Sequence, residues 1–119
     1  MLVIREGQMK AFRTRLLQEF ENRRLADIAR RFPTRYAELG EAETRSLIQI
    51  GVHASEQLDI HAEADVRNYI DLIIVYGESF DRDLKLAFET APLRNRRLPA
   101  DARVSLTMAR LGVEPGFHE

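Results

Sequence analysis

Residues 5–32 form a long stretch with a helical pattern, and this stretch constrains the fold more than any other feature. It contains no proline and only one glycine, Gly7, near its start. Its apolar residues recur at three- and four-residue spacing, which is the period of an amphipathic helix. Pro33 disfavours helical geometry at Phe32. We therefore expect one long helix over this stretch, or two helices nearly in line.

This helix carries two apolar stripes. The first consists of Met9, Phe12, Leu16 and Phe20. The second, rotated by about 100° where Leu16 gives way to Leu17, consists of Leu17, Leu25, Ile28 and Phe32. A small domain can cover one stripe with its own core, so the other stripe is a candidate contact surface. The alternative is that both stripes pack within the molecule.

Four further helices are expected after the first. The second starts at Gly40 and runs to about Gln57, and the third starts near His61 and ends at Gly77. The apolar run 72–76 favours a central, buried position for the third helix. Gly77 suits a left-handed cap that ends the third helix. A short helix capped by Asp81 ends at Pro92, and the last helix runs from Pro99 to Gly112.

The chain of 119 residues has the length of one domain and contains no cysteine. The lack of cysteine excludes disulfides, zinc–thiolate sites and thiol catalysis. The sequence predicts an all-α, single-domain bundle of about five helices over residues 1–112, with a flexible tail over residues 113–119. Neither a signal peptide nor a membrane span is evident. We expect a cytoplasmic protein with no membrane partner.

Charge is distributed unevenly along the chain. Residues 1–35 hold nine Lys/Arg and four Asp/Glu, whereas residues 36–92 hold four and twelve. These two segments are therefore complementary in sign and could attract one another, within one chain or between two. The basic runs 23–24, 30–35 and 94–97 raise nucleic acid as a possible partner. Interleaved acidic residues favour a solvated, salt-bridged helix face instead.

No arrangement of side chains indicates catalysis. His53 and Glu56 share one helix face at a spacing that suits a metal, but a two-metal bundle needs a second such motif, and none occurs. His61 is interpreted as a helix cap. No Ser-His-Asp grouping and no glycine-rich phosphate loop is present. We expect no enzyme activity, no metal and no cofactor.

Residues 4–12 read Ile-Arg-Glu-Gly-Gln-Met-Lys-Ala-Phe, which is similar to the opening Ile-Arg-x-x-Gln-Met-x-Ala-(Phe/Leu) of a family of small helical proteins. Further segments fit that family in order: Phe32-Pro33, Leu39-Gly40-Glu41, Leu47-Ile48, Gly51-Val52, and Asp65-Val66 through to Phe80-Asp81. The family resembles accessory proteins of bacterial type VI secretion systems, encoded beside the chaperones (adaptors) that load toxic effectors onto the PAAR tip of the spike. The resemblance implies a homodimer that binds an adaptor chaperone, and through it an effector, without catalysis.

The leading hypothesis is a non-catalytic co-chaperone in effector delivery. Its candidate protein interface consists of Ile4, Gln8, Met9, Phe12, Leu16 and Phe20. The alternative is an immunity protein that neutralises a toxin, since the acidic residues 36–92 would suit a basic nuclease. A second alternative is a small nucleic-acid-binding protein.

Overall fold

The structure, a computed structural model, describes residues 6–119. Its helices, in chain order, are α1 (Glu6–Arg31), α2 (Pro33–Gln57), α3 (Glu63–Tyr76), α4 (Ala87–Thr90) and α5 (Ala100–Leu111). Three short 3-10 helices, Phe80–Arg82, Leu84–Leu86 and Ala91–Arg94, flank α4. Strands are absent from the described part of the chain. The predicted all-α bundle of five helices in one domain is therefore confirmed for these residues.

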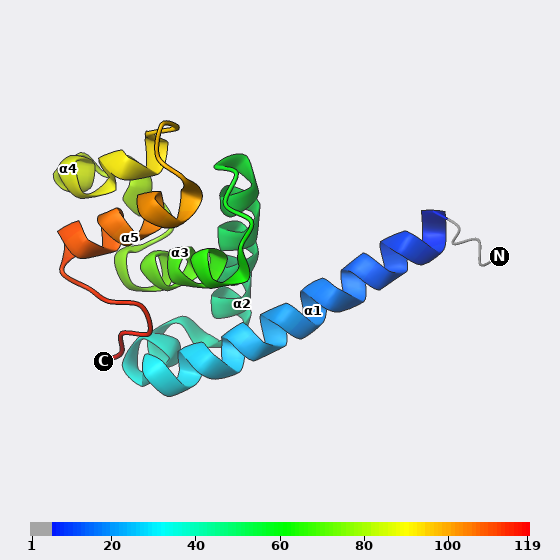
Figure 1. The fold of residues 1–119 in the computed structure, drawn as a ribbon. Helices are drawn as coiled ribbons and strands as arrows, with labels where there is room; N and C mark the ends of the chain where they lie inside the picture. Colours follow the sequence, from blue (N-terminus) through cyan, green and yellow to red (C-terminus); the bar gives the residue numbers. More distant parts are fainter. Residues whose placement is uncertain (1–5) are drawn as a thin grey trace.

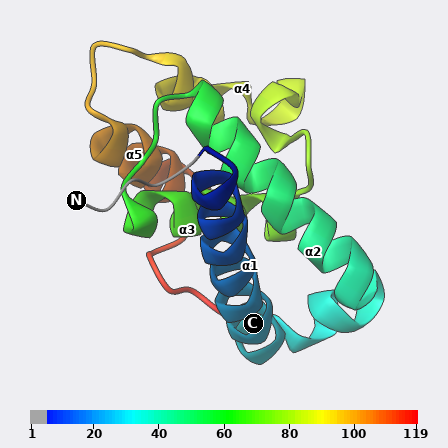
Figure 2. The ribbon, with the colours of Figure 1, turned by 90° about the vertical axis from the view of Figure 1, so that its right-hand side faces the viewer.

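The long first helix extends well beyond the rest of the molecule (Figure 1). Residues 6–19, called the arm below, are exposed except for Met9, which is half-buried. Figure 2, viewed from the side to which the arm points, shows α1 nearly end-on in front of the body formed by the other helices. The radius of gyration is 15.5 Å, against about 13.5 Å for an ordinary domain of this length. The arm accounts for the larger value.

The break between the first two helices lies where the sequence predicts it, but the second helix starts earlier than expected. Phe32, with φ −126° and ψ 60°, separates α1 from α2. Pro33 then occupies the first turn of α2, where its missing N–H removes no helical hydrogen bond. Gly40, the predicted start, is a break inside this span: its φ of 78° and ψ of 168° are non-helical, so α2 consists of two helical parts that meet there, and the second part starts where the sequence predicts.

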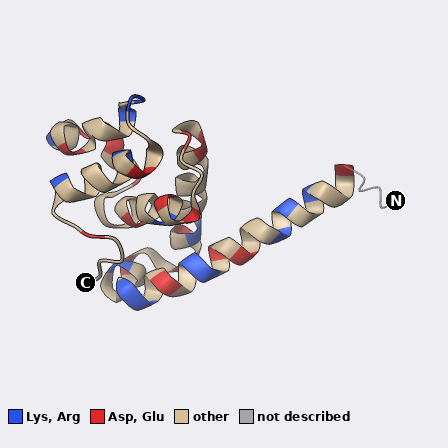
Figure 3. Cartoon of the chain, in the orientation of Figure 1, with Lys and Arg blue, Asp and Glu red and all other residues tan. Residues whose placement is uncertain are grey.

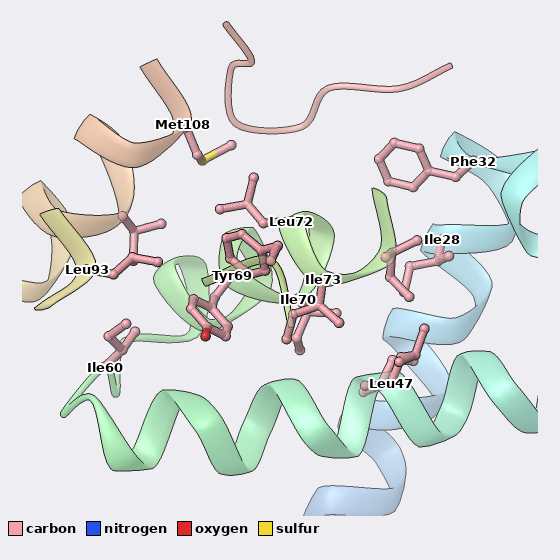
Figure 4. Close-up of a cluster of buried hydrophobic side chains, with 14 residues drawn as sticks. Ile28, Phe32, Leu47, Ile60, Tyr69, Ile70, Leu72, Ile73, Leu93 and Met108 are labelled. Carbon is pink, nitrogen blue, oxygen red and sulfur yellow. The ribbon is translucent and has the colours of Figure 1, made fainter. Parts of the chain in front are cut away.

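The core is built around α3 (Figure 4). Its buried apolar residues come from α1, α2, α3, α5 and the connecting segments: Ile28, Phe32, Leu47, Ile48, Ile60, Tyr69, Ile70, Leu72, Ile73, Ile74, Phe80, Leu93, Val104 and Met108. The expected burial of the run 72–76 holds for its first three residues, whereas Val75 is exposed. A helix that carries apolar residues on most of its surface needs neighbours on several sides. Helices α2, α5 and the end of α1 supply them.

Helices α2 and α3 approach closely at Gly51. A Cβ atom at this position would lie 2.6 Å from Cγ1 of Ile70 and 3.3 Å from Cδ1 of Ile73. Because Gly51 has no side chain, the backbones of the two helices can come together here.

The replacement Gly51→Val is expected to lower the free energy of unfolding by about 1–3 kcal/mol, because the added methyl groups overpack this contact. Urea denaturation followed by circular dichroism measures the change. Gly7→Ala is the matched control, since nothing lies within 4 Å of the Cβ position at Gly7. It should leave stability unchanged or raise it. Equal effects of the two replacements would contradict the close contact.

The segment 81–92, expected to be one short helix capped by Asp81, differs from that expectation. It consists of 3-10 turns around the single α-helical turn of α4. Asp83 is the capping residue, and its Oδ1 accepts a hydrogen bond from the Lys85 N–H at 2.9 Å. Leu84 and Phe88 are 90% and 66% exposed. Because few apolar side chains of this segment are buried, packing against the core does not stabilise a longer helix here.

The last helix ends at Gly112, as predicted. The left-handed cap expected at Gly77 is wrong, because Gly77 has φ 102° and ψ 160°, whereas Gly112 adopts the left-handed conformation. Residues 113–119, predicted to be a flexible tail, lie against the body. Arg31 donates a hydrogen bond from Nη1 to the Phe117 carbonyl at 2.9 Å. The Phe117 ring meets Phe32 edge-on, with ring centres 5.2 Å apart. The Glu119 N–H also donates to the Arg31 carbonyl at 2.9 Å, so the tail is held at the end of α1.

Candidate functional site

The arm exposes large apolar side chains that the body does not cover. Phe12, Leu16 and Leu17 are 48%, 46% and 49% exposed. Single exposed apolar residues are common on protein surfaces, but a row of them on one isolated helix is not. A helix of this length without tertiary packing is also marginally stable in water. Both observations indicate that the arm is a candidate contact surface for another protein.

The six residues of the predicted interface fall into three groups. Ile4 lies outside the described residues. Gln8, Phe12 and Leu16 are exposed on the arm, where Met9 is half-buried. Phe20 is half-buried and packs against the core cluster, so it joins the arm to the body.

The second apolar stripe divides between the body and the arm. Its last two residues, Ile28 and Phe32, are in the core, and Leu25 packs against the core. Leu17 lies before the point at which the body begins to cover α1, and it stays exposed. In the sequence pattern Leu17 belongs to the same stripe as these core residues. Its exposure follows from the structure, which shows how far along α1 the other helices extend. The arm therefore offers apolar side chains on two neighbouring faces.

Charged residues alternate with these apolar residues along the arm (Figure 3). The arm contains three basic and two acidic residues: Glu6, Lys10, Arg13, Arg15 and Glu19. The Arg15 guanidinium lies 5.4 Å from the centre of the Phe12 ring, within the range of a cation–π contact. An apolar centre with a charged rim is the usual composition of a protein–protein interface.

The base of the arm is fixed to the body by charged and aromatic contacts. Glu21, which is buried, pairs with Arg45 of α2 at 3.4 Å. The Phe20 ring packs against the core cluster, and the guanidinium groups of Arg23 and Arg24, on the same helix, lie 6.0 and 5.9 Å from its centre. The Glu21–Arg45 pair and the packing of Phe20 therefore join the base of the arm to the body.

A buried ion-pair network ties the end of α1 to α3. The Arg31 guanidinium donates from Nη1 and Nη2 to the two carboxylate oxygens of Asp71, at 3.0 and 2.8 Å. Its Nε donates to Asp27 at 2.9 Å. Burial favours a lower pKa for Arg31, but the hydrogen bonds with Asp71 and Asp27 outweigh it and raise the pKa above the ordinary value. Arg31 is therefore a permanent cation that needs its two carboxylate partners.

The arginines that suggested nucleic acid are largely engaged within the molecule. Arg24 and Arg31 are buried. Arg94 donates to the Asp81 carbonyl at 2.7 Å, and Arg96 pairs with Asp59 at 2.8 Å. Side chains that neutralise carboxylates and carbonyls are not free to neutralise a row of phosphates. The geometry does not favour a nucleic-acid-binding surface.

The histidines have ordinary surroundings. His53 and His61 are both exposed, and His61 lies 3.7 Å from Asp59. Residues 6–119 contain no group of three or more His, Asp or Glu side chains placed to hold a metal ion. Among the same residues, no helix combines the length and the apolar composition needed to cross a membrane.

The arm is thus the feature with the clearest capacity to bind, and its chemistry suits a protein surface. It offers exposed apolar side chains and a charged rim. Comparison of the chain with protein-family models, with curated proteins and with solved structures finds no match.

Proposed function

We propose that this protein is a non-catalytic co-chaperone. It binds an effector-loading chaperone (adaptor) through the arm and assists delivery of a type VI secretion toxin to the PAAR tip of the spike. The observation that carries the binding role is the row of exposed apolar side chains on the uncovered half of α1. The choice of partner rests on the resemblance of residues 4–12 and the later motifs to that accessory family.

The arm suits recognition of a helix in a groove. In this mode an amphipathic helix places apolar anchors three and four residues apart into a groove of the partner. Phe12 and Leu16 have the required spacing, and Leu17 widens the contact. Covering the exposed half of one such side chain stabilises a complex by about 1 kcal/mol. The three together contribute about 3 kcal/mol, or roughly a hundredfold in affinity.

A direct test uses an adaptor chaperone of the type beside which the accessory proteins of that family are encoded. Purified together and applied to a gel-filtration column, the two proteins should elute as one complex with a mass equal to the sum of whole subunits. Separate elution at micromolar concentration would overturn the assignment of the partner. The arm would then remain a binding surface for a different protein.

The immunity alternative predicts a different phenotype. A bacterium that produces the toxin together with this protein, and without the adaptor, should die if the protein is a co-chaperone. Survival in that experiment would favour direct neutralisation of the toxin. A co-chaperone should instead change the amount of toxin delivered to neighbouring cells.

Without its partner the protein is expected to form a homodimer. Two arms can pack antiparallel and cover the side chains that each leaves exposed, and the interface of such a dimer is the same patch on both chains. Light scattering at micromolar concentration should give twice the mass of the 13.8 kDa chain. A monomeric mass at that concentration would contradict the dimer.

A further inference from the structure

A cleft of about 850 Å³ lies between the end of α1, the first half of α3 and the C-terminal tail. It is separate from the exposed apolar row of the arm, because its α1 residues begin only at Arg24. Four arginines line it: Arg24, Arg30, Arg31 and Arg67. Three carboxylate side chains also line it: Asp27, Asp71 and Glu119.

The carboxylates of the cleft already have partners. Asp71 accepts both Nη groups of Arg31. Asp27 accepts hydrogen bonds from Arg31 and from Arg30, the latter at 2.6 Å. The Glu119 carboxylate accepts two backbone N–H groups in the first turn of α2, both at 2.9 Å. These three carboxylates therefore have few acceptor positions left for Arg24 and Arg67.

Arg24 and Arg67 differ from the other two arginines of the cleft, because Arg24 has a buried N–H without an acceptor and Arg67 has no carboxylate partner among residues 6–119. Arg24 is nine-tenths buried and donates one hydrogen bond, from Nη1 to Asp27 at 3.1 Å. Its Nε–H is buried and has no acceptor among residues 6–119. Arg67 is exposed, and its side chain has no hydrogen bond or ion pair with any residue that the structure describes.

Arg24 is affected by its burial and by the charges around it. Burial lowers the pKa of Arg24 below its ordinary value, the carboxylates of Asp27 and Asp71 oppose this, and the charges of Arg67 and Arg31 add to it. Since Arg24 has one carboxylate partner and Arg67 has none among residues 6–119, an anion in the cleft would compensate their charges.

We propose that this cleft binds an oxyanion group, a carboxylate or a phosphate, at Arg24 and Arg67. Both groups carry the paired acceptor oxygens that match the fork of a guanidinium. The ligand neutralises the two like charges and accepts hydrogen bonds from the arginines. Its source is either a free phosphate ion or an acidic side chain of another protein.

Calorimetric titration of the full chain distinguishes these sources. The two probes are inorganic phosphate and a blocked triglutamate peptide, each at low ionic strength because salt screens exposed charges. One of them should bind with one-to-one stoichiometry. Phosphate alone would identify a small-ion site, and the peptide alone would identify a site for an acidic protein segment.

The variant Arg67→Ala should weaken that binding about tenfold, which is the loss of one charge-assisted hydrogen bond. The control is Arg97→Ala, which removes the same charge from an exposed position that does not line the cleft. Circular dichroism should show both variants folded, since both side chains are exposed. Binding of neither probe would overturn the proposal, as would equal weakening by the two variants.

Discussion

Replacing Asp71 with alanine is expected to lower the free energy of unfolding by about 3–5 kcal/mol. The change leaves the Arg31 guanidinium buried with Asp27 as its one remaining carboxylate partner. Asp71 is 2% exposed and Arg31 is 8% exposed, so water cannot replace the lost carboxylate without opening the structure. Urea denaturation monitored by circular dichroism measures the loss.

The buried pair should also show coupling. In the double variant Arg31→Met with Asp71→Leu, both charges are removed and apolar side chains take their place. Its loss of stability should be smaller than the sum of the losses of the two single variants, because no charge is left unpaired. Additive losses would contradict the pairing.

An exposed ion pair supplies the control for this series. Arg35 and Glu38 lie 3.3 Å apart on the surface of α2. Glu38→Ala should cost about 0.5 kcal/mol, because solvent screens such pairs. A loss at Glu38 as large as the loss at Asp71 would show that burial is not the cause of the Asp71 effect.

Much of the fold could be predicted from helical periodicity and helix-breaking residues. Apolar spacing indicated α1 and the buried face of α3, and Pro33 and Gly112 marked helix ends. Gly40 was correctly identified as a helix boundary, because its non-helical backbone separates two helical parts of α2. The helical conformation of residues 33–39, which precede that boundary, was missed.

The candidate site was only partly predictable. The exposure of Phe12 and Leu16 was expected, because they belong to the first apolar stripe, which was the candidate interface. The exposure of Leu17 depends on where the body stops covering α1. Asp71 interrupts an apolar run, which indicates a buried charge in need of a partner. The partner, Arg31, lies 40 residues away, and no local pattern identifies it.

The second large effect is expected at the arm. The double variant Phe12→Glu with Leu16→Glu should reduce affinity for the adaptor chaperone by at least about a hundredfold, because it removes two apolar anchors and places carboxylates in the partner's groove. Stability should change little, since both side chains are about half exposed and the body does not cover them. Circular dichroism and thermal denaturation provide that check.

Gln18→Glu is the matched control. Gln18 is exposed on the arm, two residues after Leu16, and that separation places it about 200° away around the helix. The control introduces the same type of carboxylate into the same helix without removing an apolar anchor. It should bind the partner with nearly unchanged affinity.

We expect the protein to bind its partner through the apolar row of the arm. Calorimetric titration of the adaptor chaperone with the wild type, the Phe12→Glu and Leu16→Glu double variant, and Gln18→Glu measures this. The wild type and Gln18→Glu should bind tightly, and the double variant should lose about a hundredfold or more in affinity. Equal affinities for all three folded proteins would contradict this expectation.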